Sequence, residues 1–381
     1  MFFRMILSAL LAMSLYVGWR AGAVPRVRRY LPWYLRAILL VALGGSYMLA
    51  REAEGSGWPV TARALEVVGA HWLGTLLLLT VALLGADLLT GFGLFFRRRL
   101  PSIRGWALVA GLVLSGVALV QGNRPPVVRD HEVRLPGLGV DDDGLVVVFV
   151  SDMHLGSMIG ERWLNARVAQ IASLDPDLIV LGGDILEGDS PSERQLLPAL
   201  ARLSAPLGVW AVPGNHDRFG GGGMLEELER QGIRVLRNES AQLRPGLTLA
   251  GADGGRLRGP RGAVSGPAGA ATDRLAQALS RRPAGSATIL ASHFPSRVEE
   301  AARAGVGLML SGHTHDGQIW PFRYVVRTEF PYLAGRYDVG GMPLIVSRGA
   351  GTWGPRMRLW HRGDILRVRL RADAVRASGG G

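Results

Sequence analysis

The chain has 381 residues, of which 48% are hydrophobic, and it contains no cysteine, so disulfides and thiolate metal sites are excluded. Its formal net charge is +12. Residues 1–135 hold 15 arginines against 6 acidic residues, or +9, which leaves 28 arginines and 25 acidic residues, or +3, for the remainder. This near-balance in residues 136–381 argues against a groove for nucleic acid, so no nucleic-acid partner is expected.

Four strongly apolar stretches occupy the first third of the chain. They cover residues 2–19, 33–50, 67–96 and 105–121. About 20 apolar residues cross a bilayer core, so the third stretch is longer than needed, while the first and fourth are short. A cleaved signal peptide is the alternative for the first stretch, but no small-residue cleavage site precedes Arg20. We therefore expect a transmembrane region of about four helices over residues 1–121.

Arginines in the connecting loops predict the orientation of this region. The first and third loops are rich in arginine, whereas glutamates dilute the arginines of the second. Arginine-rich loops stay in the cytoplasm, so four spans place the globular half outside it, anchored to the cell membrane. Asp87 and His71 lie within the third stretch. An ionisable group at membrane depth is a functional candidate, although this stretch is long enough for either residue to lie near an interface.

The rest of the chain has the pattern of an α/β domain. Pro125 and Pro126 cannot continue the last span, so residues 122–143 are expected to form a linker, followed by a domain over 144–371 and a disordered tail over 372–381. Apolar runs predict strands, and helical spacing predicts helices between them. The strands are expected at 145–150, 178–181, 209–212, 288–291, 308–310 and 344–346, and the helices at 161–173, 192–203 and 224–231. This alternation predicts a sheet covered by helices.

Five polar motifs follow these apolar runs in chain order. They are Asp152-Met153-His154, Gly183-Asp184, Gly214-Asn215-His216-Asp217, Ser292-His293 and Gly312-His313-Thr314-His315. Loops at the carboxyl ends of strands converge, and in extended backbone the two polar residues of an Asp-x-His or His-x-His motif point to one side. Two cations about 3.5–4 Å apart need a shared ligand, and the carboxylate of Asp184 can bridge them. Nitrogen and oxygen ligands without sulfur suit Mn, Fe, Zn or Co.

Together these motifs resemble the calcineurin-like metallophosphoesterase family. The resemblance extends over residues 133–370, and residues 316–319, 332–337 and 347–354 look like the membrane-linked bacterial branch of the family. It implies a β-sandwich flanked by helices, preceded here by the four-helix transmembrane region. Members commonly have glycine where this chain has Asp316, which adds a carboxylate beside His315 and removes no ligand.

The resemblance also implies the roles of the site residues. Asp152, His154 and His315 would hold one divalent transition metal, Asn215, His293 and His313 would hold the second, and Asp184 would bridge them. His216 would stabilise the transition state or protonate the leaving oxygen, and Asp217 would hydrogen-bond to the His216 ring and orient it. A hydroxide that bridges the two metals would attack phosphorus in line with the leaving group.

The leading hypothesis is therefore a membrane-anchored phosphoesterase that binds two metals, with manganese among the candidates. It would cleave phosphodiesters or phosphomonoesters in lipid-linked or envelope substrates. A pyrophosphohydrolase for a UDP-linked lipid A precursor is an alternative, although that substrate is cytoplasmic and the domain is expected outside. A nuclease is disfavoured by the charge balance. A non-catalytic metal-binding scaffold on the same fold usually lacks ligands that are intact here. A transporter finds little support in four spans with one or two ionisable groups.

Overall fold

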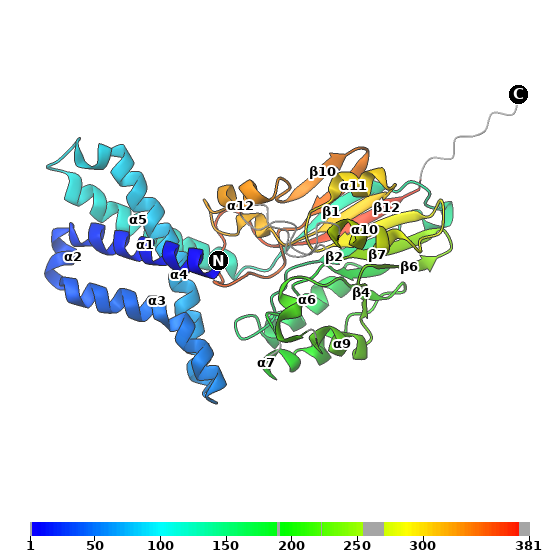
Figure 1. Ribbon diagram of the computed structural model, residues 1–381, viewed down its shortest axis with the longest axis horizontal. Coiled ribbons are helices and arrows are strands. Elements are labelled where there is room, and N and C mark those ends of the chain that lie inside the picture. Colours follow the sequence, from blue (N-terminus) through cyan, green and yellow to red (C-terminus); the bar gives the residue numbers. More distant parts are fainter. Residues whose placement is uncertain (1, 189–190, 222, 254–269, 373–381) are drawn as a thin grey trace, which may run out of the picture. The chain divides into compact units, whose positions relative to one another are not determined.

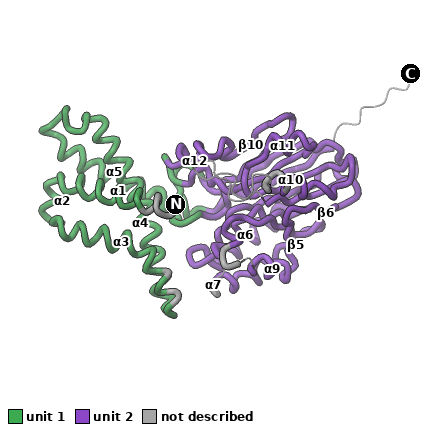
Figure 2. Tube along the Cα trace, viewed as in Figure 1, with its two compact units in different colours: residues 1–124, 319–321, 353–361 green, residues 125–318, 322–352, 362–381 purple. Residues whose placement is uncertain are grey.

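The computed structural model of the chain describes residues 2–188, 191–221, 223–253 and 270–372 (Figure 1). The chain forms two compact units (Figure 2). Unit 1 comprises residues 1–124, 319–321 and 353–361, and unit 2 comprises residues 125–318, 322–352 and 362–381. The tail expected over 372–381 lies outside the described residues except for Ala372.

Unit 1 is built from helices. Within the described residues these are α1 (Phe2–Gly22), α2 (Pro25–Tyr30), α3 (Trp33–Gly55), α4 (Pro59–Leu89) and α5 (Leu100–Gly122), with a short 3-10 turn, η1 (Gly91–Gly93), between the last two. Three of them contain segments long and apolar enough to cross a membrane: Trp33–Ala50, Pro59–Leu89 and Leu100–Gly122. Three of the four expected spans are thereby confirmed as candidates. The first expected span is helical, but it is not among these segments of the described chain, so a fourth span stays a prediction.

A buried ionic cluster joins α1, α4 and α5. The Asp87 side chain is fully buried, and its Oδ2 lies 2.6 Å from Arg20 Nε. Arg104 donates to Asp87 Oδ1 through Nε (3.1 Å) and Nη2 (2.9 Å), and the Tyr16 hydroxyl donates to Oδ2 at 2.7 Å. Both oxygens of Asp87 therefore have charged or hydroxyl partners from neighbouring helices. Because a buried carboxylate is costly unless paired, this cluster is a reason for the three helices to stay together.

Unit 2 contains two mixed six-stranded sheets. The first has the order β1-β12-β2-β3-β4-β5, and the second β10-β11-β9-β8-β7-β6. The strands of the first sheet are β1 (Val127–Arg134), β2 (Val146–Val150), β3 (Leu178–Leu181), β4 (Val209–Ala211), β5 (Arg234–Val235) and β12 (Asp364–Arg371). Those of the second are β6 (Glu239–Arg244), β7 (Leu247–Ala252), β8 (Ala287–Ser292), β9 (Leu308–Ser311), β10 (Gly335–Val339) and β11 (Met342–Val346). Every strand expected from the sequence is confirmed, because each apolar run is buried on both faces.

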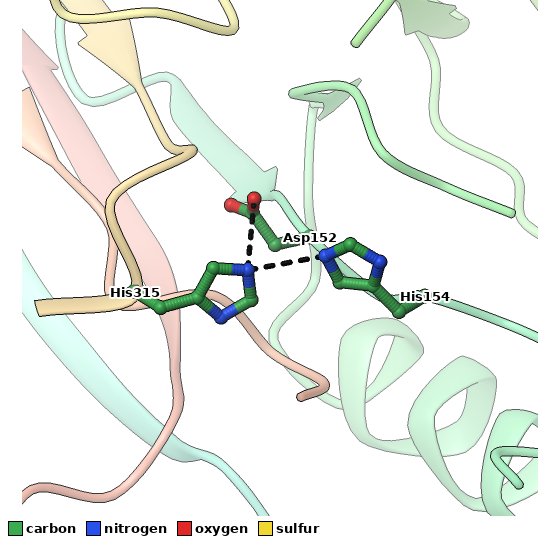
Figure 3. Close-up of side chains that lie close together, drawn as sticks. All are labelled: Asp152, His154 and His315. Atoms are coloured by element: carbon green, nitrogen blue, oxygen red, sulfur yellow. Dashed lines mark hydrogen bonds and ion pairs between the residues drawn. The ribbon is translucent and has the colours of Figure 1, made fainter. Parts of the chain in front are cut away.

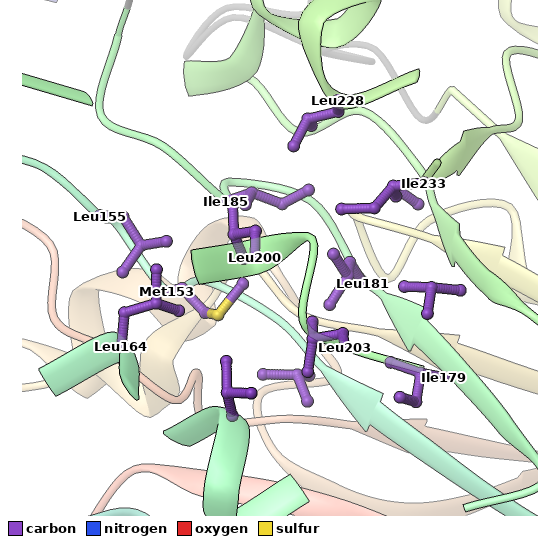
Figure 4. Packing of buried hydrophobic residues seen from close by; sticks show 14 of the residues in the cluster. Met153, Leu155, Leu164, Ile179, Leu181, Ile185, Leu200, Leu203, Leu228 and Ile233 are labelled. Atoms are coloured by element: carbon purple, nitrogen blue, oxygen red, sulfur yellow. The ribbon is translucent and has the colours of Figure 1, made fainter. Parts of the chain in front are cut away.

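The alternation of side chains within each strand makes the two sheets a sandwich. Val147 and Phe149 of β2 join Leu308 and Leu310 of β9 in one core that contains residues of both sheets. The other β2 residues, such as Val148, point the opposite way into a second core beneath helices. Figure 4 shows part of this core, including Ile179 of β3 and Leu164 of α6. Successive side chains of a strand face opposite sides, so a strand that is apolar throughout is packed on both.

Helices cover the outer faces of the sandwich. The described ones are α6 (Glu161–Ala172), α7 (Pro191–Arg194), α8 (Leu197–Leu200), α9 (Gly223–Arg230), α10 (Ala270–Leu279), α11 (Val298–Arg303) and α12 (Arg323–Glu329). Leu164, Leu200 and Leu228 pack from α6, α8 and α9 onto the first sheet, and Leu275 and Val298 pack from α10 and α11 onto the second. The expected helix at 192–203 is instead two short helices, because Pro198 cannot donate to a preceding turn and lies where α8 begins.

The segment expected as a linker is partly structured. Residues 127–134 form β1, an edge strand that pairs in parallel with β12 from Val127 opposite Asp364 to Arg134 opposite Arg371. Most of its residues are charged or polar, and Val133 is fully buried in the core between the sheets. A charge-rich strand is compatible with an edge position, and it was missed because so few of its residues are apolar.

Candidate metal centre

The five motifs follow five strands that end at the same side of the sandwich. In the first sheet, β2, β3 and β4 run parallel to one another, and in the second sheet β8 and β9 are parallel. Asp152 follows β2, Asp184 follows β3, Asn215 follows β4, His293 directly follows β8, and His313 follows β9. The prediction that these loops converge at the carboxyl ends of strands is met by the distances below.

One group of side chains consists of Asp152, His154 and His315, which point toward one another (Figure 3). His315 Nε2 lies 3.3 Å from Asp152 Oδ1 and 3.1 Å from His154 Nε2. All three residues are buried, and the three donor atoms lie within 4.8 Å of one another. This spacing lets the three atoms surround a single cation.

A second group consists of Asp184, His293 and His313. His293 Nε2 is 3.2 Å from Asp184 Oδ2 and 3.3 Å from His313 Nδ1. His293 Nε2 also lies 4.0 Å from Asp152 Oδ1, so the second group adjoins the first. Two cations could be held next to each other by these two sets of donors.

A third group links the other two and includes the expected catalytic histidine. It consists of His154, Asp184 and His216, with Asp184 Oδ2 3.9 Å from His154 Nε2. The backbone N–H of His216 donates to Asp184 Oδ1 at 2.8 Å, so the preceding residue, Asn215, is held at this place. Among the described residues the Asn215 Oδ1 atom is buried and has no hydrogen-bond partner. A buried amide oxygen without a partner is costly, and a cation would satisfy it.

The backbone of these loops differs from the expected extended form. Asp152, His154, Asp184, His313 and His315 all have positive φ, between 47° and 70°. The paired residues of the first and last motifs meet because the chain turns sharply after each strand, and not because of the two-residue repeat of a strand. Non-glycine residues in this region cost of order 1–3 kcal/mol each, and such strain concentrates at functional sites.

Two glycines permit the close approach of these loops. Gly183 has φ 86°, and a Cβ there would lie 2.8 Å from His293 Nδ1. A Cβ on Gly312 would lie 2.4 Å from Asp152 Oδ2. Any larger residue at either position would push a candidate ligand away from the site.

Glu187, which the motif pattern did not include, connects two of the site histidines. Its Oε1 lies 2.9 Å from His154 Nδ1, and its Oε2 lies 3.1 Å from His216 Nδ1. Each ring is therefore oriented by a carboxylate on the nitrogen that faces away from the candidate metal positions. The available signal in the sequence was an acidic residue in the same loop as Asp184, three positions further on.

Asp217 has a different environment from the one expected. Its Oδ1 accepts from the backbone N–H groups of Ile185 (2.9 Å) and Leu186 (3.3 Å), and its Oδ2 accepts from that of Gly214 (2.8 Å). It is buried, and burial followed by the charge of Asp184 raises its pKa. The carboxylate that lies against the His216 ring is Glu187, so the orienting role predicted for Asp217 falls to Glu187. Asp217 instead holds the loops after β3 and β4 together.

The electrostatics of the centre favour bound positive charge. Burial would raise the pKa values of Asp152 and Asp184, but the neighbouring imidazoles hold both carboxyls far below their usual range. Burial would lower the pKa of His154, yet Glu187 and then Asp184 outweigh it and raise this pKa to about 9. Burial and the nearby His293 lower the pKa of His313 to about 3, so His313 is a neutral donor. Metals bind ionised carboxylates and neutral imidazoles, so a cation that binds here would have to displace the proton of His154.

Asp316 ties the loop of the last two histidines to two arginines. It is buried, with φ 54°, and its Oδ1 lies 3.2 Å from Arg323 Nη2. Its Oδ2 accepts from Arg348 Nε at 3.2 Å, and Arg348 Nη1 lies 3.5 Å from Asp364 Oδ2. The neighbour of Arg348 is Gly349, where a Cβ would lie 3.1 Å from His315 Nδ1. The departure from glycine at position 316 thus adds a carboxylate that is paired with arginines.

Comparison with known proteins agrees with this geometry. The sequence profile of the calcineurin-like phosphoesterase family matches residues 145–317. A metallophosphoesterase of Aquifex aeolicus is 34% identical over 230 residues, which cover 59% of this chain and 84% of that protein. A transmembrane protein with a metallophosphoesterase domain from Danio rerio is 32% identical over 279 residues, or 70% of this chain and 62% of that protein. A metallophosphoesterase of Helicobacter pylori is 30% identical over 253 residues, or 66% and 65%.

The fold, the grouped histidines and carboxylates and these similarities define the family of this chain. The chain belongs to the calcineurin-like metallophosphoesterase family. It has an intact cluster of histidine and aspartate side chains that could hold metal ions, and its relatives include proteins named as transmembrane metallophosphoesterases. The chain spans slightly less than two thirds of the Danio rerio and Helicobacter pylori proteins, at 62% and 65% of their lengths.

Proposed function

We propose that the protein is a membrane-anchored phosphoesterase that uses two divalent transition metals, such as manganese, to hydrolyse phosphodiester or phosphomonoester bonds. Asp152, His154 and His315 would bind the first metal. Asn215, His293 and His313 would bind the second, with Asp184 shared between them. The observation that carries the proposal is that two three-residue groups lie side by side, with Asp184 Oδ2 within 3.2 Å of His293 Nε2 and 3.9 Å of His154 Nε2.

The donor set of the structure fits two cations. The described residues supply carboxylate and imidazole atoms within 4.8 Å of one another in each group, together with the unpartnered Oδ1 of Asn215. Two divalent ions carry +4, and the carboxylates of Asp152 and Asp184 offset two of these charges. The remaining positive charge would attract a phosphate oxygen, and a neutral Asn215 preserves it.

The chain's own residues would then position and protonate the substrate. Bound metals at such a site lower the pKa of coordinated water toward about 7 and polarise the phosphoryl oxygens. His216 is only partly buried, and its Nδ1 faces Glu187, so we assign the action on the substrate to Nε2. The ring could donate a proton from Nε2 to the leaving oxygen, with Glu187 holding the ring in place through Nδ1.

The expected sidedness of the catalytic unit depends on the loop between α4 and α5. This loop carries Arg97, Arg98 and Arg99, which favour the cytoplasmic side. α5 would then leave the cytoplasm and place residues after Gly122 outside it, whether or not α1 spans. An alkaline phosphatase fusion after Gln121 should be active, and an inactive fusion beside an active cytoplasmic reporter would contradict this orientation.

Lipid-linked or envelope phosphate esters are the substrate class that we favour for this anchored site. The apolar helices would hold the enzyme at a bilayer, as the name of the Danio rerio relative says of that protein. An extracytoplasmic site of this kind would not meet a cytoplasmic UDP-linked lipid A precursor. The proposed anchoring therefore favours an ester or diester in the membrane or envelope over that pyrophosphate.

The proposal is tested by metal content and hydrolysis in the same preparation. The purified full chain should contain close to two transition-metal ions and should hydrolyse an aryl phosphodiester or phosphomonoester. Asp184→Ala should lose metal and fall to background activity, because the proposal has this carboxylate bind both metals. Asp175→Ala, an exposed aspartate of unit 2, is the matched control and should retain both properties. Metal-loaded protein that cleaves neither ester would overturn the proposal.

A further inference from the structure

Two short segments from the C-terminal half of the sequence belong to the helical unit. They are residues 319–321 and 353–361, coloured with the helices in Figure 2. Ile319, Met357 and Leu359 are buried in one apolar cluster with Leu78 of α4 and Ala118 of α5. These segments are therefore part of the packing of the candidate membrane helices and are not surface loops of the sandwich alone.

The second segment is also fixed by polar contacts with the end of α5. The backbone N–H of Arg358 donates to the carbonyl oxygen of Ala118 at 2.8 Å. The backbone N–H of Trp360 donates to Gln121 Oε1 at 2.8 Å. A Cβ on Gly122 would lie 2.4 Å from the carbonyl oxygen of Arg356, so only glycine allows this approach. These contacts fix residues 356–360 beside the last turns of α5.

This docking leaves two large aromatic side chains at the surface of unit 1. Trp353 is 47% exposed and Trp360 is 54% exposed. Beside Gln121, the helix surface itself is apolar and exposed, with Leu119 at 41% and Val120 at 59%. The backbone of the exposed Trp360 is therefore held at the end of a candidate membrane span whose exposed residues there are apolar.

The length of α5 gives the depth of this surface. Its 23 residues make a helix about 35 Å long at 1.5 Å per residue, slightly more than the ~30 Å hydrocarbon core. Gln121 is the next-to-last residue of α5, so Trp360 lies where a spanning helix leaves the hydrocarbon. Tryptophan is enriched at this boundary, because its ring is apolar and its N–H can reach headgroup oxygens or water.

We propose that residues 353–361 form a membrane-interface segment whose partner is the lipid bilayer, with the side chains of Trp353 and Trp360 in contact with lipid at the level of the headgroups. We choose lipid and not a protein partner as the occupant, because the segment is fixed to the end of α5, a candidate membrane span whose exposed residues are apolar.

The interface segment follows closely on a loop of the metal centre. Gly351 donates its backbone N–H to the carbonyl oxygen of Asp152 at 2.9 Å, and Thr352 alone separates Gly351 from Trp353. An interface position for Trp353 would keep this stretch of chain near the depth of lipid phosphates. This consequence rests on the proposed function, and it favours phosphate esters presented at the bilayer surface as the substrate class.

The absence of cysteine allows a direct test with single labelled cysteines in the full chain. Trp360→Cys and, separately, Trp353→Cys would carry an environment-sensitive fluorophore, in liposomes of phosphatidylethanolamine and phosphatidylglycerol. Each label should show emission shifted to shorter wavelength and a loss of intensity with a nitroxide placed near the lipid glycerol, greater than the loss with aqueous iodide.

Two control positions make the outcome decisive. Val113→Cys, on the exposed face of α5, should report lipid, and Asp175→Cys, exposed in unit 2, should report water. If Val113 reports lipid while both tryptophan positions behave like Asp175, the interface proposal is wrong although α5 spans. If both tryptophan positions are shielded from iodide and from the nitroxide lipid, protein covers them and the proposal is also overturned. None of these readouts uses catalysis, so failure here is distinct from failure of the proposed function.

Discussion

Two of the buried clusters of charged side chains, one in each unit, contrast in how completely their charges are satisfied. In the helical unit, Asp87 is surrounded by Arg20, Arg104 and Tyr16, and both of its oxygens have partners from the chain itself. In the sandwich unit, imidazoles face one another across about 3 Å, as His154 and His315 do. The first cluster is complete without any other group, whereas the second brings together donors that a cation would join.

The pairing of the buried charges distinguishes a structural cluster from a reactive one. Buried charge is costly in both places, and the helical unit offsets the cost with arginines. In the metal centre, the residues with positive φ and the amide oxygen without a partner both make the folded state less stable. Substitutions should therefore affect stability in the helical cluster and metal binding or rate in the centre.

Among variants that keep both metals, the largest effect on rate is expected for a substitution of His216. Its side chain is the one in the centre placed to act on substrate and not assigned to a metal. His216→Ala should lower kcat by about 10²- to 10⁴-fold, the usual contribution of a general acid or base. Metal content, measured in the same sample, should stay near that of the unsubstituted protein. A parallel loss of metal would show that His216 is a ligand and would weaken its proposed role.

Asp87→Ala should show the opposite pattern. Removing the carboxylate leaves Arg20 and Arg104 buried without their partner, which costs about 3–5 kcal/mol when a buried pair is broken. Thermal unfolding in detergent should reveal this loss, while kcat per folded, metal-loaded molecule should change little. Leu88→Ala, at an exposed neighbouring position, is the matched control. An unchanged unfolding temperature for Asp87→Ala would contradict the structural role.

Glu187 should affect both metal binding and rate, because it contacts His154, a proposed metal ligand, and His216, the proposed catalytic histidine. Glu187→Gln keeps the size of the side chain but removes the charge that faces His154 and His216. Residues that orient metal ligands typically contribute 10- to 100-fold to metal affinity or activity, and a loss of about this size is expected. Glu226→Gln, on the exposed side of α9, should behave like the unsubstituted protein. An effect confined to stability would place Glu187 outside the centre.

The smallest effect is expected at Asp316. Asp316→Ala would release Arg323 and Arg348 and loosen the loop that contacts His315. We expect roughly a tenfold weaker affinity for one of the two metals, at the low end for residues behind metal ligands, with activity rescued by added metal. Asp175→Ala replaces an aspartate of similar φ (48°) without these ion pairs, and it controls for the backbone change. Equal weakening of both metals would argue against this local role.

The sequence was sufficient to predict the parts that depend on continuous apolar runs and short motifs. Strands such as β2 and β3 are apolar throughout, so their positions and the convergence of their loops were predictable. Strand β1 was missed because it is charge-rich and pairs with a strand more than 200 residues later in the chain. Local pattern carries little information about such distant pairing.

The details of the site depended on tertiary contacts that no local pattern contains. The role of Glu187 appears only when the loops after β2, β3 and β4 meet, since its two partners belong to different loops. The partners of Asp217 are backbone amides of the β3 and β4 loops, and not the neighbouring ring. The sharp turns at Asp152 and His315 replaced the extended backbone that the spacing indicated.

The central claim is that two metals lie side by side between these loops. Anomalous diffraction from crystals of the metal-loaded chain would test it most directly. Two peaks are expected about 3.5–4 Å apart, with Asp184 between them. A single peak, or peaks bound by residues other than those of the five motifs, would contradict it.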